Sequence, residues 1–321
     1  MPMHPMLPLV PLVAMIPIQT SQEGLQQTTQ AEIVTLKAKQ GRLTVPVRVI
    51  DKGPFEFLVD TGSENTVLST GLAQELALIP KAKVTLISVA GRERVDTVEV
   101  DQLDLGKRSF YALTAPLLEN RDIGAAGILG LDSLQGQRVL IDFKKQLMLV
   151  DDAKSLGGNR GFEIVVTARR RSGQLIMTNA KIDGVWTDVV IDTGAETTIG
   201  NRALQRALEL RKGKMQQTVL HSVTGQQIVA DLGHGAQLSI GDMNINNVEI
   251  AFADSPPFNA LQLEERPAIF LGMRELRVFK RVAIDFASRK ILFDLPGGFT
   301  NALSQERDEQ VLRRHGGQSG F

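Results

Sequence analysis

The stretch Phe57-Leu58-Val59-Asp60-Thr61-Gly62-Ser63-Glu64 governs how this chain is organised, because it recurs as Val189-Val190-Ile191-Asp192-Thr193-Gly194-Ala195-Glu196. Each copy begins as an apolar run typical of a buried strand and then reaches Asp-Thr-Gly. A carboxylate at the end of a core strand is costly to bury unless it is paired. One copy alone is typical of a turn that ends a strand. Two copies, each after an apolar run and each followed by a small residue and Glu, indicate a shared function.

A longer repeat surrounds the two motifs. Each motif is followed by a predicted short helix and then by a predicted hairpin, and the interval from the Asp to the hairpin tip is nearly the same in both copies. An apolar-apolar-Gly element and a closing hairpin complete each half, so the sequence predicts a duplicated unit. The paired landmarks are Asp60 and Asp192, the helices 71–79 and 201–210, the tips Gly91 and Gly225, and Gly130 and Gly272.

The repeat also predicts the domain organisation. We expect an all-β chain of two β-barrel lobes related by a pseudo-two-fold axis, with a short helix or two per lobe. A polar, glycine-rich linker separates the lobes. The predicted parts are an N-terminal arm at 1–30, lobe one at 31–150, the linker at 151–161, lobe two at 162–296 and a polar tail at 297–321.

The composition narrows the classes of function. The chain has 321 residues, with 36 Lys plus Arg against 36 Asp plus Glu, and this zero net charge argues against a nucleic-acid binder. It has no Cys, which excludes a disulfide, a thiol nucleophile and a thiolate metal site. Its 4 His residues are scattered without zinc-site spacing. We therefore expect no metal and no cofactor.

The N-terminal arm is apolar from Met6 to Ile18, which is typical of a secretory signal. No Lys or Arg precedes the run, and no clear cleavage site follows it. A start codon assigned too far downstream, or a disordered arm, would leave the same pattern. The sequence favours export, to a bacterial periplasm or the medium, and a cytoplasmic location if the run is not a signal. Residues 19–40 are long enough to act as a prosegment in a cleft.

The two Asp residues predict a chemistry when they are placed together. A pseudo-two-fold axis would set Asp60 opposite Asp192. Two facing carboxylates cannot both ionise, so they share one proton over a broad pH range. The ionised member can take a proton from a water held between them. The protonated member can hydrogen-bond a substrate carbonyl and stabilise the developing oxyanion. The pair therefore predicts peptide hydrolysis without a metal or a covalent intermediate.

With these motifs the chain resembles the aspartic protease clan of pepsins and retroviral proteases. Its short lobes look like two retroviral-type (retropepsin-like) units fused in one chain, as in bacterial single-chain aspartyl proteases. The resemblance covers roughly residues 31–296. It implies an aspartic endopeptidase with a polypeptide substrate, such as an exported or membrane-protein segment. It also implies a monomer in which the dyad forms in cis.

The resemblance extends to residues that flank the dyad. Glu64 and Glu196 fill the place where retroviral proteases carry an acid that contacts substrate backbone. A structural ion pair, with Arg274 in the case of Glu196, is the equal alternative. The other implied roles are a cross-bond between Thr61 and Thr193 beneath the dyad, close approach of substrate backbone at Gly62 and Gly194, and two flap tips at Gly91 and Gly225.

The two halves differ at one position beside the dyad, where Ser63 faces Ala195 in the alignment of the motifs. A hydroxyl beside Asp60 would stabilise its ionised form. The sequence therefore predicts that Asp60 is the readier anion and that Ser63→Ala shifts the acid limb of the pH profile.

Two other interpretations stay open. The first is a non-catalytic peptide-binding module of the same fold, although a binder has no need of two facing buried carboxylates. The second is a protease active only as a dimer, although two units in one chain make a partner unnecessary. Neither flap carries the Tyr typical of pepsin-like flaps, because the single Tyr is Tyr111. This favours a two-flap, retroviral type.

Overall fold

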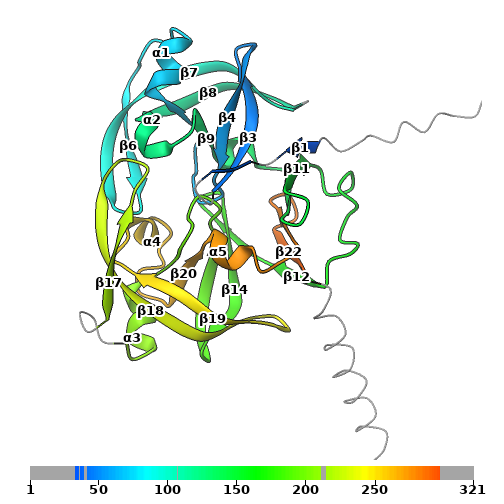
Figure 1. Ribbon diagram of the computed structural model, residues 1–321, viewed down its shortest axis with the longest axis vertical. Coiled ribbons are helices and arrows are strands. Elements are labelled where there is room, and N and C mark those ends of the chain that lie inside the picture. The colour runs from blue at the N-terminus through cyan, green and yellow to red at the C-terminus, as the bar shows by residue number, and fades with distance from the viewer. Residues whose placement is uncertain (1–32, 36, 40–41, 107, 211–214, 297–321) are drawn as a thin grey trace, which may run out of the picture. The chain divides into compact units, whose positions relative to one another are not determined.

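The computed structural model describes residues 33–35, 37–39, 42–106, 108–210 and 215–296 (Figure 1). The predicted N-terminal arm, with its signal, and the predicted polar tail lie outside the described residues. Within the described part of the chain, no helix is long and apolar enough to cross a membrane.

The first lobe is built on a sheet of eight strands in the order β2-β3-β4-β9-β5-β8-β7-β6. An additional pairing of β3 with β7 closes six of these strands into a barrel. Closure of these six strands encloses a core, and β2 and β6 remain outside the barrel as the terminal strands of the sheet. The strands are β2 (Lys37–Lys39), β3 (Arg42–Val49), β4 (Lys52–Val59), β5 (Val67–Ser69), β6 (Lys83–Ser88), β7 (Gly91–Leu105), β8 (Arg108–Leu118) and β9 (Gly127–Leu129).

The second lobe repeats this plan strand for strand, in the order β13-β14-β15-β20-β16-β19-β18-β17. Here β14 pairs with β18 and closes the barrel. The predicted all-β fold and its duplication are therefore confirmed. The strands are β13 (Arg169–Arg171), β14 (Gln174–Ile182), β15 (Val185–Ile191), β16 (Thr198–Gly200), β17 (Gln216–His221), β18 (Gln227–Ile240), β19 (Met243–Phe252) and β20 (Ala268–Leu271).

A third sheet, of six strands, joins the two halves of the chain. Its order is β1-β11-β10-β21-β22-β12, so the closing hairpins of both lobes pair with each other through β10 and β21. The sequence showed the two hairpins but not their pairing. The strands are β1 (Ile33–Thr35), β10 (Arg138–Asp142), β11 (Leu147–Asp151), β12 (Ile164–Thr167), β21 (Arg281–Asp285) and β22 (Lys290–Asp294).

The helices are shorter than the sequence predicted. In α1 (Thr70–Glu75), Ser69 caps the first turn, and in α3 (Arg202–Ala207), Asn201 does so. Both helices end where Ala77 (φ 54°) and Glu209 (φ 57°) turn left-handed in Schellman motifs. The remaining helices are α2 (Asn120–Ile123), α4 (Pro256–Ala260), α5 (Met273–Leu276) and the 3₁₀ turn η1 (Leu131–Ser133).

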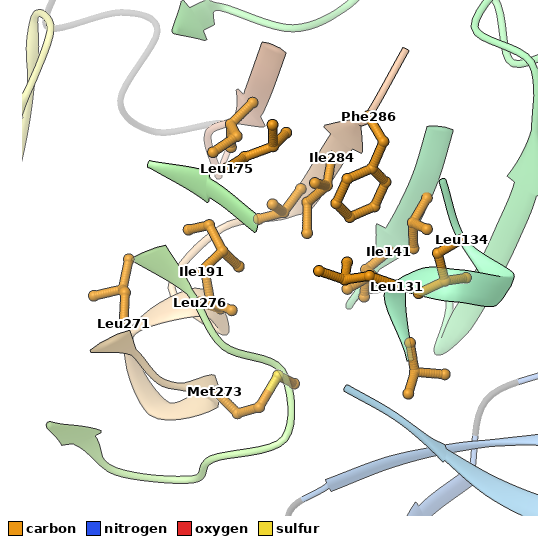
Figure 2. Close-up of a cluster of buried hydrophobic side chains, with 14 of the residues drawn as sticks. Leu131, Leu134, Ile141, Leu175, Ile191, Leu271, Met273, Leu276, Ile284 and Phe286 are labelled. Atoms are coloured by element: carbon orange, nitrogen blue, oxygen red, sulfur yellow. The ribbon is translucent and has the colours of Figure 1, made fainter. Parts of the chain in front are cut away.

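One apolar core runs through both lobes. Figure 2 shows Leu131 and Ile141 of the first lobe in the same cluster as Ile191 and Ile284 of the second. All four side chains are buried. Because η1 and the end of β15 contribute to this cluster, the loops that follow the two motif strands rest on packed side chains.

Candidate active site

Each motif Asp directly follows a buried strand end. The last three residues of β4 and of β15 are buried, and each strand pairs in parallel with a short neighbour, β9 or β20. Asp60 N donates to Leu129 O at 3.1 Å, and Asp192 N donates to Leu271 O at 3.0 Å. The parallel pairing therefore fixes the point at which each carboxylate leaves its sheet.

Two threonines tie the motif loops together across the lobes. Thr61 N donates to Thr193 Oγ1 at 3.1 Å, and Thr193 N donates to Thr61 Oγ1 at 3.2 Å. Each hydroxyl then donates to a carbonyl of the opposite strand, Thr61 to Ile191 O at 2.8 Å and Thr193 to Val59 O at 2.7 Å. Both side chains are buried, so these bonds are shielded from water. They hold the two loops in one register.

The motif glycines allow the two carboxylates to approach. A Cβ at Gly62 would lie 2.9 Å from Asp192 Oδ1, and a Cβ at Gly194 would lie 2.6 Å from Asp60 Oδ1. Each glycine therefore packs against the Asp of the other lobe. The resemblance implied close approach of substrate backbone at these glycines, and the structure adds a contact of each with the dyad.

The carboxylates face each other and share a hydrogen bond. Gly62 N and Ser63 N donate to Asp60 Oδ1 at 2.8 and 3.1 Å, and Gly194 N and Ala195 N donate to Asp192 Oδ1 at 2.9 and 3.2 Å. Burial, and then the charge of Asp60, raise the pKa of Asp192 to about 8. Near neutral pH the pair therefore holds one shared proton.

Ser63 does not act as the sequence predicted. Its hydroxyl donates to Asn65 O at 2.9 Å, and it is the backbone N–H of Ser63 that reaches Asp60. The equivalent N–H is present at Ala195. The Ser63 hydroxyl therefore gives no reason for Ser63→Ala to shift the acid limb of a pH profile.

A second layer of polar groups supports each motif loop. Thr66 donates to Asp132 Oδ1 at 2.6 Å, and Gly130 N donates to Thr66 Oγ1 at 3.2 Å. In lobe two, Thr198 donates to Glu275, and burial raises the pKa of this carboxyl. The sequence missed both acids. Each acid lies two or three residues after the apolar-apolar-Gly element, and this shared spacing could have identified them from the sequence.

The glycines of those elements are required by packing. A Cβ at Gly130 would lie 2.8 Å from Thr66 N, and one at Gly272 would lie 2.8 Å from the Thr197 carbonyl carbon. Any larger residue would displace the backbone of the motif loop. Gly130 and Gly272 therefore support the motif loops through close packing.

Glu196 forms an ion pair, but with a partner other than the expected one. Its Oε1 accepts from Arg277 Nη1 at 2.6 Å, while Arg274 pairs with Glu249. The prediction of Arg274 was wrong because α5 directs the two Arg side chains to different acids. Glu64 is exposed, and its backbone carbonyl accepts from Asp132 N at 3.2 Å.

Two hairpins extend from the barrels, one per lobe. The first, β6–β7, turns at Val89 and Ala90, and Gly91 pairs with Ser88 as the first residue of β7. The second, β17–β18, turns through 222–226 and includes Gly225 at φ 77°.

Each hairpin tip contacts the opposite lobe. Val89 packs against a lobe-two cluster that includes Ile199 and Phe270, and Ser255 Oγ donates to Val89 O at 2.8 Å. Val223 packs against a lobe-one cluster that includes Ile123. Ser88 and Thr224 hydroxyls lie 3.3 Å apart, so the two tips also meet each other.

This chain belongs to the aspartyl protease family. The family model described as "Aspartyl protease" matches it twice, at residues 45–133 and 178–274, which agrees with the duplicated barrels. Among solved structures, a retropepsin-like aspartic protease from Rickettsia conorii is similar over 41% of this chain and 89% of its own, with 20% identity and a TM-score of 0.32. No curated protein matches the chain. The double match of the family model confirms the predicted resemblance to aspartic proteases.

Proposed function

We propose that the chain is an aspartic endopeptidase that hydrolyses peptide bonds with a water activated between Asp60 and Asp192. The observation that carries the proposal is the pair of half-buried carboxyl groups at equivalent strand ends, joined by a hydrogen bond that needs one proton. Family membership supports a peptidase in general.

The proposed reaction uses the two carboxyl groups in different states. Ionised Asp60 takes a proton from the water, which attacks the scissile carbonyl carbon. Protonated Asp192 donates a hydrogen bond to the carbonyl oxygen and stabilises the oxyanion. Asp192 passes its proton to the oxyanion, which gives a gem-diol intermediate. Asp60 then donates the proton it took from water to the amide nitrogen, and the carbon–nitrogen bond breaks. A hydroxyl of the gem-diol returns a proton to Asp192, which leaves a carboxylic acid, a free amine and the dyad in its starting state. The backbone N–H groups at Gly62, Ser63, Gly194 and Ala195 keep both carboxylates oriented throughout.

We further propose that the hairpins β6–β7 and β17–β18 are flaps that close over an extended peptide. Their contacts with the opposite lobes support this proposal, because such tips can cover a bound chain from both sides. We propose a monomer with the dyad formed in cis, which the six-stranded sheet between the lobes supports. The expected substrate is an exported or membrane-protein segment, and the expected location is outside the cytoplasm if residues 6–18 act as a signal.

Cleavage of denatured casein from pH 4 to 8 tests the reaction, with wild type, Asp60→Asn, Asp192→Asn and added pepstatin. We expect pepstatin to inhibit, and either substitution to lower turnover at least about 100-fold, because each removes one half of the acid–base pair. Activity that survives one substitution would contradict a single dyad.

Two other outcomes have definite meanings. A folded wild type that binds peptides without cleaving them would favour the non-catalytic binding module. A dimer in gel filtration, with specific activity lost on dilution, would contradict the dyad in cis.

A further inference from the structure

Gln174 connects the second lobe to the dyad loop of the first. It is the first residue of β14 and is 4% exposed. Its Nε2 donates to Gly62 O at 2.6 Å, across the boundary between the lobes. Neither the motifs nor the family comparison assigns it a role.

The direction of the Gln174 amide is fixed by this bond. Reversing the amide would set Oε1 against the Gly62 carbonyl, where two acceptors would repel. In the observed direction, Gln174 Oε1 is buried and finds no hydrogen-bond donor in the described part of the chain. A buried acceptor without a donor destabilises a fold, so Gln is a poor choice here for stability alone.

The bond from Gln174 acts on a peptide group that also contacts Asp60. The carbonyl of this group belongs to Gly62 and its N–H belongs to Ser63, which donates to Asp60 Oδ1 at 3.1 Å. Gln174, the peptide group and Asp60 therefore form a continuous chain of hydrogen bonds. A donor on the carbonyl polarises the peptide group and makes its N–H a stronger donor. A stronger donor to Asp60 favours the ionised carboxylate.

The equivalent loop of the second lobe makes the same backbone contact, with Ala195 N donating to Asp192 Oδ1 at 3.2 Å. The position equivalent to Gln174 differs in residue type, because β14 begins with Gln174 whereas β3 begins with Arg42. The bond from Gln174 Nε2 to Gly62 O acts on the loop that holds Asp60.

We propose that Gln174 is a positioning residue that, through the Gly62–Ser63 peptide group, makes Asp60 the ionised member of the dyad and leaves the proton on Asp192. The inference deepens the proposed function and rests on it. The raised pKa of Asp192 agrees with this distribution. The charged groups around the dyad are Asp192 on the facing loop, Glu64 and Glu196 four residues beyond each Asp, Arg277 paired with Glu196, and Asp132 and Glu275 in the supporting layer.

The test compares Gln174→Met with the matched control Gln137→Met. Met keeps a similar side-chain size and removes the donor. Gln137 is also buried with an unpaired Oε1, and it lies beside β10 rather than at the motif loops. Gln174→Leu provides a second donor-free variant if Gln174→Met does not fold.

Two readouts are needed, and one of them is independent of turnover. The first is the pH profile of kcat for casein-derived peptide cleavage. The second is a ¹³C NMR titration of Asp carboxyl carbons, assigned with Asp60→Asn and Asp192→Asn. For Gln174→Met we expect the acid limb of the pH profile, and the lower of the two dyad pKa values, to rise by about half a pH unit. The reason is that loss of the Gln174 donor makes Ser63 N–H a weaker donor to ionised Asp60. The thermal midpoint should stay within about 2 °C of wild type, since an unpaired buried acceptor is removed as well.

The outcomes separate this inference from the proposed function. An unmoved acid limb and an unmoved titration in both donor-free variants would overturn the role of Gln174. An equal shift in Gln137→Met would do the same, because the effect would then be a general response of the fold. If wild type cleaves no peptide, the proposed function fails, and the NMR titration alone decides whether Gln174 sets the proton position.

Discussion

At the residue scale, two identical Asp-Thr-Gly motifs occupy unequal surroundings. Burial and the facing charge raise the pKa of Asp192 to about 8, although its loop donates two backbone N–H groups just as the Asp60 loop does. Because the motif is identical in both lobes, it does not determine which of the two Asp residues carries the shared proton. The groups that differ are those packed against the loops, such as Gln174 on Gly62 O.

The raised pKa of Asp192 predicts how activity and stability change in mildly alkaline solution. Because the folded pKa of Asp192 lies above its ordinary value, the stability gained by its protonated form is complete below the unfolded pKa and is lost as the pH rises through about 8. We expect turnover to fall over the same range. Asp192→Asn cannot ionise, so its thermal midpoint should match wild type at about pH 3.5, below the unfolded pKa, and exceed it by several degrees at pH 9. Equal midpoints at both pH values, measured by scanning fluorimetry, would refute the assignment.

At the element scale, equivalent helices have caps of unequal strength. Ser69 accepts one hydrogen bond, from Leu72 N, at the start of α1. Asn201 caps α3 through Leu204 N and also donates to Leu263 O and Arg266 O at 2.7 and 2.6 Å. The Asn side chain thus joins α3 to the loop before β20, next to the strand that supports Asp192.

Removal of the two caps should therefore differ in effect. Ser69→Ala is expected to lower the free energy of unfolding by about 1 kcal/mol, which is usual for a lost N-cap. Asn201→Ala also removes the side-chain donor to Arg266 O and the acceptor of Ala268 N, so we expect a loss of about 3 kcal/mol. Urea unfolding of both variants measures the difference, and equal losses would show that the Asn201 bonds to the loop contribute nothing.

At the scale of the whole molecule, a buried ion pair crosses the sheet that joins the lobes. Arg138 on β10 and Asp285 on β21 lie opposite each other in register, with Arg138 Nη2 2.7 Å from Asp285 Oδ2. Their side chains are 2% and 1% exposed. Burial alone would raise the pKa of Asp285, but hydrogen bonds from Ser288 and Arg138 outweigh it and hold the pKa below its usual value.

Breaking this pair should destabilise the whole molecule. Arg138→Met leaves a buried carboxylate without its partner, and we expect a loss of about 3–5 kcal/mol. The control Arg108→Met breaks the more exposed pair with Asp151 and should cost about 1 kcal/mol or less. Since the folded pKa of Asp285 is lowered, its contribution is complete above the unfolded value and is lost as the pH falls through the folded value. The loss of unfolding free energy caused by Arg138→Met should therefore become smaller as the pH falls. A loss that stays the same between pH 7 and pH 3, measured by urea unfolding, would contradict this.

The sequence alone determined the local features, because these depend on neighbouring residues. The apolar runs before Asp60 and Asp192 predicted buried strands, and the predicted helices 71–79 and 201–210 begin within one residue of α1 and α3. The repeat then predicted two equivalent β lobes, and the threonine cross-bonds have the geometry that the resemblance implied. Helix ends were misjudged because Ala77 and Glu209 adopt a left-handed conformation that their residue types do not favour.

Only the tertiary structure decided which distant residues meet. Pairing of β10 with β21, the Arg277–Glu196 ion pair and the bond from Gln174 to Gly62 each join residues far apart in the chain. No periodicity encodes such contacts, because they depend on how the two lobes pack after each has formed. For the same reason, the repeated motif specified two equivalent carboxylates, whereas the groups packed against each motif loop became known only from the structure.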